Sequence, residues 1–277
     1  RRQGRRGSAA RPTLFYRQVA HHGGVNRVRA MQQQPSIVAA WGETGQVQLF
    51  DLSAQLAGLE QQQHPLPRAQ QQQARAQAQA PLQAFSGHRA EGFALDWSPL
   101  TVGRLLTGDC VEEIYCWERH EGGKWQVGGP LKGHTGSVED VQWSPTEPNV
   151  FASCSADRTV RIWDVREPAQ SRPVLTVQAH SADVNVISWN RLATPMLASG
   201  GDDGCFRIWD LRTFKDGAFV ANFAYHTQPV TSIEWSPFES SELAVTSADH
   251  QLSIWDLSLE RDSEAETAAG VNQDSMQ

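Results

Sequence analysis

A histidine recurs every 46 residues along the central part of the chain, and two tryptophans follow each histidine at fixed distances of nine and 29 residues. Such constant spacing indicates a series of similar small units in which each unit packs against its neighbours. Eight of the ten tryptophans belong to this pattern. Its members are His88, His134, His180 and His226, then Trp97, Trp143, Trp189 and Trp235, and finally Trp117, Trp163, Trp209 and Trp255.

Each unit reads as four short β-strands separated by turns. After His134, apolar residues lie at Val138, Val141 and Trp143, and this break in strict alternation predicts a β-bulge in the first strand. A tight turn that contains Asp157 is expected between the second and third strands. The four strands expected in this unit lie within residues 138–143, 151–154, 159–163 and 173–177.

An earlier, degenerate unit precedes the four regular ones. It shows three strands, within residues 25–29, 37–41 and 46–51, and it ends in Phe50-Asp51 where the regular units end in Trp-Asp or Trp-Glu. The chain is therefore predicted to be all-β with five repeated units. Their expected boundaries are about 21–52, 84–130, 131–176, 177–222 and 223–258.

Three further segments differ from the repeats in composition. Residues 1–20 contain six arginines and no acidic residue, and we expect a disordered segment there. Residues 53–83 are an insertion rich in Gln and Ala, a composition that favours a flexible loop or a marginal helix over a strand. Residues 259–277 form an acidic polar tail.

Four short strands in each 46-residue unit, with Gly-His and Trp-Asp signatures, resemble the WD-repeat family, whose units are the blades of a β-propeller. The resemblance implies a WD-repeat β-propeller with five of the seven blades of a closed ring, so we expect a partial or alternatively spliced product. It also implies a buried hydrogen-bond network in each blade. The residues of this network are His134, Ser153, Asp157 and Trp163 in one unit, and His180, Ser199, Asp203 and Trp209 in the next.

A serine, a histidine and an aspartate in one unit also imitate a hydrolytic site. A nucleophile repeated in successive units does not suit a single active site, whereas a fully satisfied hydrogen-bond network does suit a repeat. We therefore expect no catalytic residue, no metal site and no cofactor. Two units depart from the pattern, because Val245 replaces the serine in the last unit and Val111 replaces the aspartate in the unit that ends at Trp117. We expect these two blades to be held less firmly.

The charge of the repeats favours basic partners. With six of the 24 basic residues in the first 20 positions, residues 21–277 hold 18 basic and 31 acidic side chains. An acidic body argues against direct binding to a nucleic-acid backbone, because phosphate contacts need Lys and Arg.

Side chains beside the bulge and beside the Asp turn should share one end of the blades. There they would form an acidic face that suits a basic protein such as a histone or a ribosomal protein, and a merely solvated acidic rim is the alternative. The residues of this acidic face, our candidate for client binding, are Glu91, Phe93, Glu139, Asp183, Asn185 and Asp202.

Arg166 and Arg212 each complete a Trp-Asp-x-Arg sequence at the end of a unit. In WD-repeat proteins that act as substrate receptors of cullin-type ubiquitin ligases, such an arginine contacts the adaptor. The resemblance therefore implies adaptor docking as an alternative function. An arginine after a strand is also commonly just solvated.

Several stretches carry more specific residues than a generic blade requires. They lie within residues 23–29, 87–99, 103–110, 137–140, 183–189 and 248–251. They resemble the glutamate-rich branch of the WD-repeat family, which is related to the histone-binding WD proteins.

This resemblance implies a non-enzymatic scaffold of the nucleus and nucleolus that binds histones or a large-subunit ribosomal protein in ribosome biogenesis and chromatin assembly. The chain departs from that branch because Arg-rich sequence stands where a glutamate-rich segment is expected. No run approaches about 18 apolar residues, so we expect no membrane partner.

Overall fold

The computed structural model describes residues 15–61, 79–166 and 172–258. Most of the Arg-rich segment over residues 1–20, the middle of the Gln/Ala-rich insertion and the acidic tail lie outside the described residues. No helix among the described residues is long and apolar enough to cross a membrane.

The strands form five antiparallel sheets, four with four strands and one with three, and consecutive strands pair in each sheet. The first sheet contains β1 (Val25–Met31), β2 (Gln34–Gly42), β3 (Val47–Asp51) and β4 (Gln83–Phe85). The second contains β5 (Gly92–Trp97), β6 (Leu105–Asp109), β7 (Ile114–Arg119) and β8 (Trp125–Val127).

The other three sheets repeat the same plan. The third contains β9 (Val138–Trp143), β10 (Val150–Ser155), β11 (Thr159–Asp164) and β12 (Leu175–Gln178). The fourth contains β13 (Val184–Trp189), β14 (Met196–Gly201), β15 (Cys205–Asp210) and β16 (Phe219–Ala224), with a short 3-10 helix at Leu211–Thr213. The last contains β17 (Val230–Trp235), β18 (Glu242–Ser247) and β19 (Leu252–Asp256).

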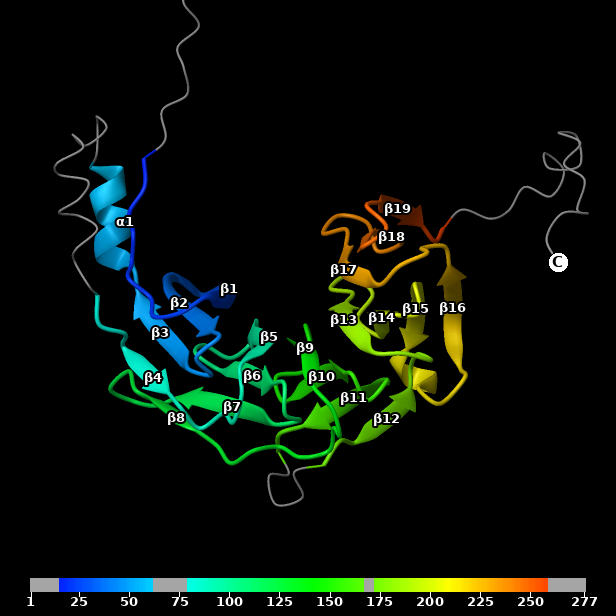
Figure 1. The fold of residues 1–277 in the computed structure, drawn as a ribbon, viewed down its shortest axis with the longest axis horizontal. Coiled ribbons are helices and arrows are strands. Elements are labelled where there is room, and N and C mark those ends of the chain that lie inside the picture. The colour runs from blue at the N-terminus through cyan, green and yellow to red at the C-terminus, as the bar shows by residue number, and fades with distance from the viewer. Residues whose placement is uncertain (1–14, 62–78, 167–171, 259–277) are drawn as a thin grey trace, which may run out of the picture.

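The sheets stand side by side in an open arc (Figure 1). The first strand of each sheet lies on the concave side of the arc, and these strands contact one another in the order β1, β5, β9, β13 and β17. The fourth strands lie on the convex side. The prediction of an all-β chain with five blades in an incomplete propeller is confirmed.

The Gln/Ala-rich insertion falls inside the first sheet and not after it. Its described part begins with helix α1 (Ser53–Glu60), and β4 follows the insertion and pairs with β3. Our predicted boundaries placed residue 84 in the second unit, so the fourth strand of the first sheet was assigned to the wrong blade. A three-residue strand carries too little alternation to be recognised from sequence.

A bulge interrupts the first strand of every sheet at the same place. The register between the first and second strands shifts there because one residue of the first strand has no direct partner. This confirms the bulge that the apolar pattern predicted. The bulged residues are Asn26, Phe93, Glu139, Asn185 and Thr231.

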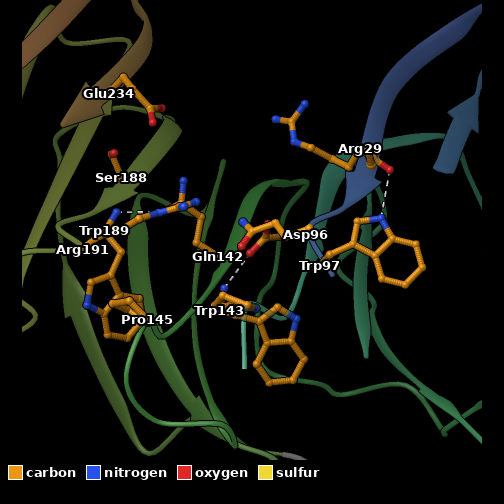
Figure 2. A pocket seen from close by; sticks show the side chains of 13 residues that line it. Arg29, Asp96, Trp97, Gln142, Trp143, Pro145, Ser188, Trp189, Arg191 and Glu234 are labelled. Atoms are coloured by element: carbon orange, nitrogen blue, oxygen red, sulfur yellow. Dashed lines mark hydrogen bonds between the residues drawn. The ribbon is translucent and has the colours of Figure 1, made fainter. Parts of the chain in front are cut away.

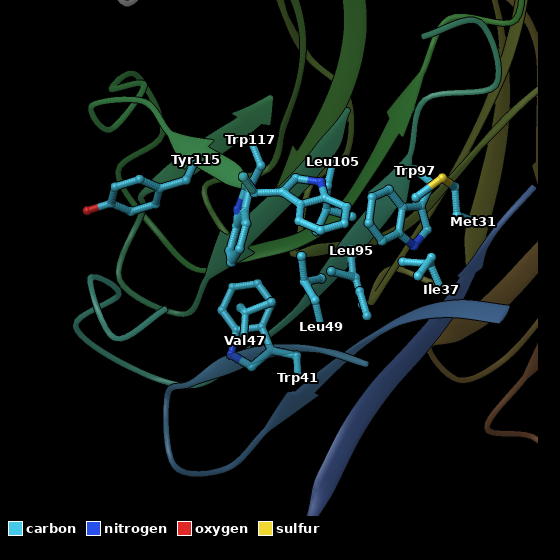
Figure 3. Close-up of a cluster of buried hydrophobic side chains, with 12 residues drawn as sticks. Met31, Ile37, Trp41, Val47, Leu49, Leu95, Trp97, Leu105, Tyr115 and Trp117 are labelled. Atoms are coloured by element: carbon cyan, nitrogen blue, oxygen red, sulfur yellow. The ribbon is translucent and has the colours of Figure 1, made fainter. Parts of the chain in front are cut away.

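The core consists of apolar side chains packed between neighbouring sheets. In one cluster, Trp41 and Leu49 of the first sheet lie against Leu95 and Trp117 of the second (Figure 3). Trp117, Trp163 and Trp209 are almost fully buried, with exposed fractions of 0%, 2% and 1%, whereas Trp255 of the last sheet is half-buried. Each sheet therefore depends on its neighbour to bury its apolar face, as expected of a repeat fold.

Candidate functional site

In the third sheet, one histidine ties a loop and a turn to two strands. His134 lies in the loop before β9, with its Nδ1 2.9 Å from Asp157 Oδ2 and its Nε2 2.6 Å from Ser153 Oγ. Trp163 Nε1 donates to the same Ser153 oxygen at 2.8 Å. If the neutral ring carries its proton on Nδ1, every donor in this chain of bonds meets an acceptor. We call this arrangement the histidine network.

The fourth sheet contains the same network. His180 Nδ1 lies 3.0 Å from Asp203 Oδ1, and its Nε2 lies 2.8 Å from Ser199 Oγ. Trp209 Nε1 donates to Ser199 Oγ at 2.9 Å. The equal geometry in two successive sheets follows from the 46-residue repeat.

The burial and the protonation of the network residues indicate a structural role. Ser153 and Ser199 are both 0% exposed, so no substrate could reach their hydroxyl groups. Burial lowers the pKa of His134, which favours the neutral ring. Burial alone would raise the pKa of Asp157, but the hydrogen bond with His134 and further donors hold it well below its usual range. A carboxylate that remains charged beside a neutral histidine suits a permanent hydrogen bond.

The second sheet forms the network with two substitute residues. His88 Nδ1 lies 3.0 Å from Asp109 Oδ2, and its Nε2 lies 2.8 Å from Thr107 Oγ1. Trp117 Nε1 donates to Thr107 Oγ1 at 3.0 Å. Asp109 lies two residues before Val111, where we expected the acid to be missing. The expectation that this blade lacks its partner is therefore wrong.

The last sheet also contains the histidine network, but its hydroxyl group comes from a different strand. His226 Nδ1 lies 3.0 Å from Asp249 Oδ2, and its Nε2 lies 3.0 Å from Ser253 Oγ, which also accepts a bond from Trp255 Nε1 at 2.8 Å. Ser253 lies on β19 directly opposite Val245 on β18. The hydroxyl group has thus moved to the paired strand, and our expectation for this blade was also wrong.

This relocation predicts a compensating pair of substitutions. Ser253→Ala removes the acceptor of Trp255 and the partner of His226, and it should lower the free energy of unfolding by about 1–3 kcal/mol. Val245→Ser places a hydroxyl at the position equivalent to Ser199, so it should cost less stability when Ser253 is already alanine. Chemical denaturation of the two single variants and the double variant measures this coupling. Additive effects would contradict the prediction.

The acidic face lies at one end of the sheets, beside the Asp turns. Cys110 N in one turn donates to Glu91 O at 2.9 Å, and Asp202 N in another donates to Asp183 O at 2.8 Å. The segment before each first strand therefore lies against the turn between the second and third strands.

Two asparagines at bulges position acidic side chains of this face. Asn26 Nδ2 donates to Glu91 Oε2 at 2.8 Å and so links the first sheet to the second. Asn185 Nδ2 donates to Asp202 Oδ1 at 2.7 Å and to Val230 O of the last sheet at 3.1 Å. These bonds hold two of the carboxylates in fixed positions before any partner binds.

The predicted residues of the acidic face differ in exposure. Asp183 and Asp202 are exposed, whereas Glu91 and Glu139 are half-buried. Phe93 is 37% exposed and presents an apolar surface at a bulge among these acids. The six predicted residues thus come from three successive sheets and lie at the same end of them.

Sequence reasoning missed Asn26, which belongs to the same face. It stands at the bulge of the degenerate first unit, at the position that Phe93 and Glu139 occupy in their own units. Counting from the bulge, and not from the histidine, would have identified it.

Arg166 and Arg212 follow β11 and β15, at the end of the sheets opposite the acidic face. Both side chains are exposed, and each pairs with the aspartate two residues earlier. The Arg212 guanidinium lies 2.6 Å from Asp210, and Arg166 pairs with Asp164 in the same way. The two arginines therefore present equivalent, ordered surfaces on neighbouring sheets.

Comparison with known sequences identifies the repeats. Residues 125–164, 171–210 and 217–256 match the family model described as WD domain, G-beta repeat. These ranges fall within the second to fifth of the sheets described above.

Three named relatives match a similar share of the chain. It is 48% identical over 132 residues to Glutamate-rich WD repeat-containing protein 1 of Dictyostelium discoideum, covering 47% of this chain and 25% of that protein. It is 41% identical over 137 residues to Ribosome assembly protein rrb1 of Schizosaccharomyces pombe, a match that covers 47% of this chain and 26% of that protein. It is 33% identical over 131 residues to Histone acetyltransferase type B subunit 2 of the same yeast, a match that covers 45% of this chain and 27% of that protein. The matched region thus spans about a quarter of each relative's length.

Proposed function

The chain is a WD40-repeat protein related to these WD proteins, and from this premise we propose that it is a non-enzymatic scaffold whose acidic face binds basic client proteins. The clients that we propose are histones or a large-subunit ribosomal protein, bound during chromatin assembly and ribosome biogenesis. The observation that carries the proposal is the set of acidic side chains at the bulges and Asp turns of neighbouring sheets.

The structure supports a protein partner for this face in three ways. Asn26 and Asn185 hold Glu91 and Asp202 through hydrogen bonds, so part of the charge is fixed in advance. The nearby Arg89 is paired with Glu113 at 3.6 Å, which reduces its repulsion of a basic client. Complementary charge gives specificity and a fast association rate, and the exposed ring of Phe93 adds apolar contact area.

The names of the relatives support the choice of client. One relative is named for ribosome assembly and another for a histone acetyltransferase subunit. Histones and ribosomal proteins are both strongly basic, which matches the negative charge of the repeats. The similarity to these two relatives also supports a location in the nucleus and nucleolus.

A pull-down from nuclear extract at physiological salt tests this function. The native chain is compared with a variant in which Glu91, Glu139, Asp183 and Asp202 are all changed to Lys. We expect the native chain to recover histones or ribosomal proteins and the variant to recover neither, because like charges now face the client.

The matched control changes four exposed glutamates outside the acidic face to Lys, so that both variants carry the same net charge. The control residues are Glu60, Glu121, Glu147 and Glu239. We expect the control to recover the same clients as the native chain. Equal recovery by all three proteins, or by none, would refute the acidic face as the client site.

A second candidate function rests on Arg166 and Arg212. Their matching pairs with Asp164 and Asp210 present two identical charged groups on neighbouring sheets, which would suit the adaptor of a cullin-type ubiquitin ligase. Changing both arginines to Ala should abolish co-precipitation of the adaptor and leave histone recovery unchanged. Adaptor recovery that survives the double substitution would remove this candidate.

A further inference from the structure

The end of the sheets opposite the acidic face carries exposed apolar side chains at equivalent positions. In the turns between first and second strands, the second residue after the opening Ser or Asn is Leu100, Leu192 or Phe238. Their exposed fractions are 45%, 51% and 86%, respectively. We call the surface formed by these three residues and their turns the turn face. Three large apolar residues at the same repeat position on one face indicate a binding surface more than chance exposure does.

Each of these turns is built so that its apolar residue points outward. The backbone N–H of the apolar residue donates to a side-chain oxygen two positions earlier, which fixes the turn. These bonds join Leu100 to Ser98 at 3.3 Å, Leu192 to Asn190 at 2.9 Å, and Phe238 to Ser236 at 3.3 Å.

Hydrogen bonds between neighbouring sheets also brace these turns against one another. A rigid surface loses little conformational entropy when a partner binds to it. The bracing bonds run from Gln33 Nε2 to Ser98 O at 2.9 Å, from Arg104 to Pro148 O at 2.9 Å, and from Asn190 Nδ2 to Ser240 O at 2.7 Å.

A cavity of about 450 Å³ opens on the concave side beside the same turns (Figure 2). Figure 2 shows Arg29 of the first sheet and Glu234 of the last on opposite sides of it, with Asp96 and Gln142 between them. Arg191, which lies in the turn next to Leu192, lines it as well. The cavity therefore draws its polar groups from all five sheets.

Among the exposed side chains that line this cavity, two are positively charged and one is negatively charged. Arg29 and Arg191 are exposed, and neither forms an ion pair with any residue that the structure describes. The Asp96 carboxylate already accepts the backbone N–H of Trp143 at 2.8 Å. Of the other lining residues, only Glu234 adds an exposed carboxylate. Two exposed guanidinium groups without a direct ion pair to a described residue fit an incoming carboxylate, because Arg binds carboxylates through paired hydrogen bonds.

We propose that the turn face and this cavity bind a segment of a partner protein in which an acidic side chain is flanked by apolar residues. The carboxylate lies between Arg29 and Arg191, and the apolar residues pack on Leu100, Leu192 and Phe238. This partner has the opposite charge from the client of the acidic face, so the chain can hold two proteins at opposite ends of its sheets.

A phage-displayed library of random peptides, selected on the full native chain, tests the proposal. We expect the enriched peptides to combine an acidic residue with apolar neighbours. Fluorescence anisotropy of the enriched peptides should show affinity losses of about tenfold or more for Arg29→Glu with Arg191→Glu, and for Phe238→Ser. All these side chains are exposed, and a cooperative thermal unfolding transition shows that each variant folds.

Two controls separate this site from the rest of the molecule. Lys215→Glu with Val220→Ser changes an exposed charge and an exposed apolar residue away from the turns, and it should leave peptide affinity unchanged. The four-lysine variant of the acidic face should also bind the peptides normally, whatever its effect on basic clients.

Three results would overturn the proposal. The first is a selection in which no peptide is enriched more strongly on the native chain than on an unrelated protein. The second is a set of enriched peptides that lack acidic residues, or whose affinity the substitutions do not change. The third is sedimentation that shows self-association of the native chain and its loss in Phe238→Ser, which would make a second copy the occupant.

Discussion

Replacing Asp157 with alanine is expected to lower the free energy of unfolding by about 3–5 kcal/mol, because this nearly buried carboxylate joins several parts of one blade. Its removal takes away the short hydrogen bond of His134 Nδ1, to which, among the described residues, only Thr159 Oγ1 at 3.4 Å then remains close, and it removes the bonds between the turn and β11. The carboxylate accepts bonds from His134 Nδ1 at 2.9 Å, Thr135 N at 3.1 Å, Thr159 N at 3.0 Å, Thr159 Oγ1 at 2.6 Å and Arg161 at 3.1 Å.

Urea unfolding followed by tryptophan fluorescence measures this loss. The matched control is Asp164→Ala, which removes a carboxylate from the same blade whose side-chain partner, Arg166, is exposed. Exposed ion pairs contribute little to stability, so the control should unfold close to the native midpoint. A loss for Asp157→Ala as small as that of the control would show that the histidine network does not hold the blade.

The second large effect concerns a carboxylate on the concave side of the arc. Burial raises the pKa of Asp96 to about 7, and the negative charge of Asp140 adds to this rise. The hydrogen bond from Trp143 N and the charges of Arg29 and Arg191 act in the opposite direction. The folded state therefore binds a proton at Asp96 more tightly than the unfolded chain does.

The sign of the pH dependence follows from linkage. A raised pKa in the folded state contributes stability that is fully present below the unfolded pKa of 3.8 and is lost as the pH rises through about 7. Asp96→Asn cannot titrate but keeps an oxygen that can accept the Trp143 N–H. On acidification from about pH 8 to pH 5, the native chain should gain stability relative to this variant, by about 2–3 kcal/mol.

Unfolding of both proteins across this pH range measures the difference. Charged groups that do not interact with Asp96 are the same in both proteins, so their effects cancel when the two curves are subtracted. The native chain should also gain stability on acidification relative to Asp140→Asn, but at a lower pH, since burial raises the pKa of Asp140 to about 6. Parallel curves for the native chain and Asp96→Asn would contradict this account of the concave side.

The architecture was predictable because the repeat has large residues at fixed positions. A Trp at the end of the third strand and a His before the first strand mark the blade boundaries wherever the spacing holds. The bulge was predictable from the apolar pattern of Val138, Val141 and Trp143 for the same reason.

The hydrogen-bond partners of His226 and His88 could not be predicted from repeat positions alone. A hydrogen bond needs an oxygen at the right point in space, and Ser253 reaches that point from the strand opposite Val245. Asp109 likewise serves His88 from two residues before the expected place. The cavity between Arg29 and Glu234 was not predicted either, because residues from five different sheets build it.

The most direct test of the central claim is a binding titration between the purified chain and purified histones, repeated at low and at physiological salt. We predict binding by the native chain that weakens as salt rises, and a loss of about tenfold or more when Glu91, Glu139, Asp183 and Asp202 are changed to Lys. The four-glutamate control should bind as the native chain does. Equal affinity of the four-lysine variant and the native chain would contradict the acidic face as the site where basic clients bind.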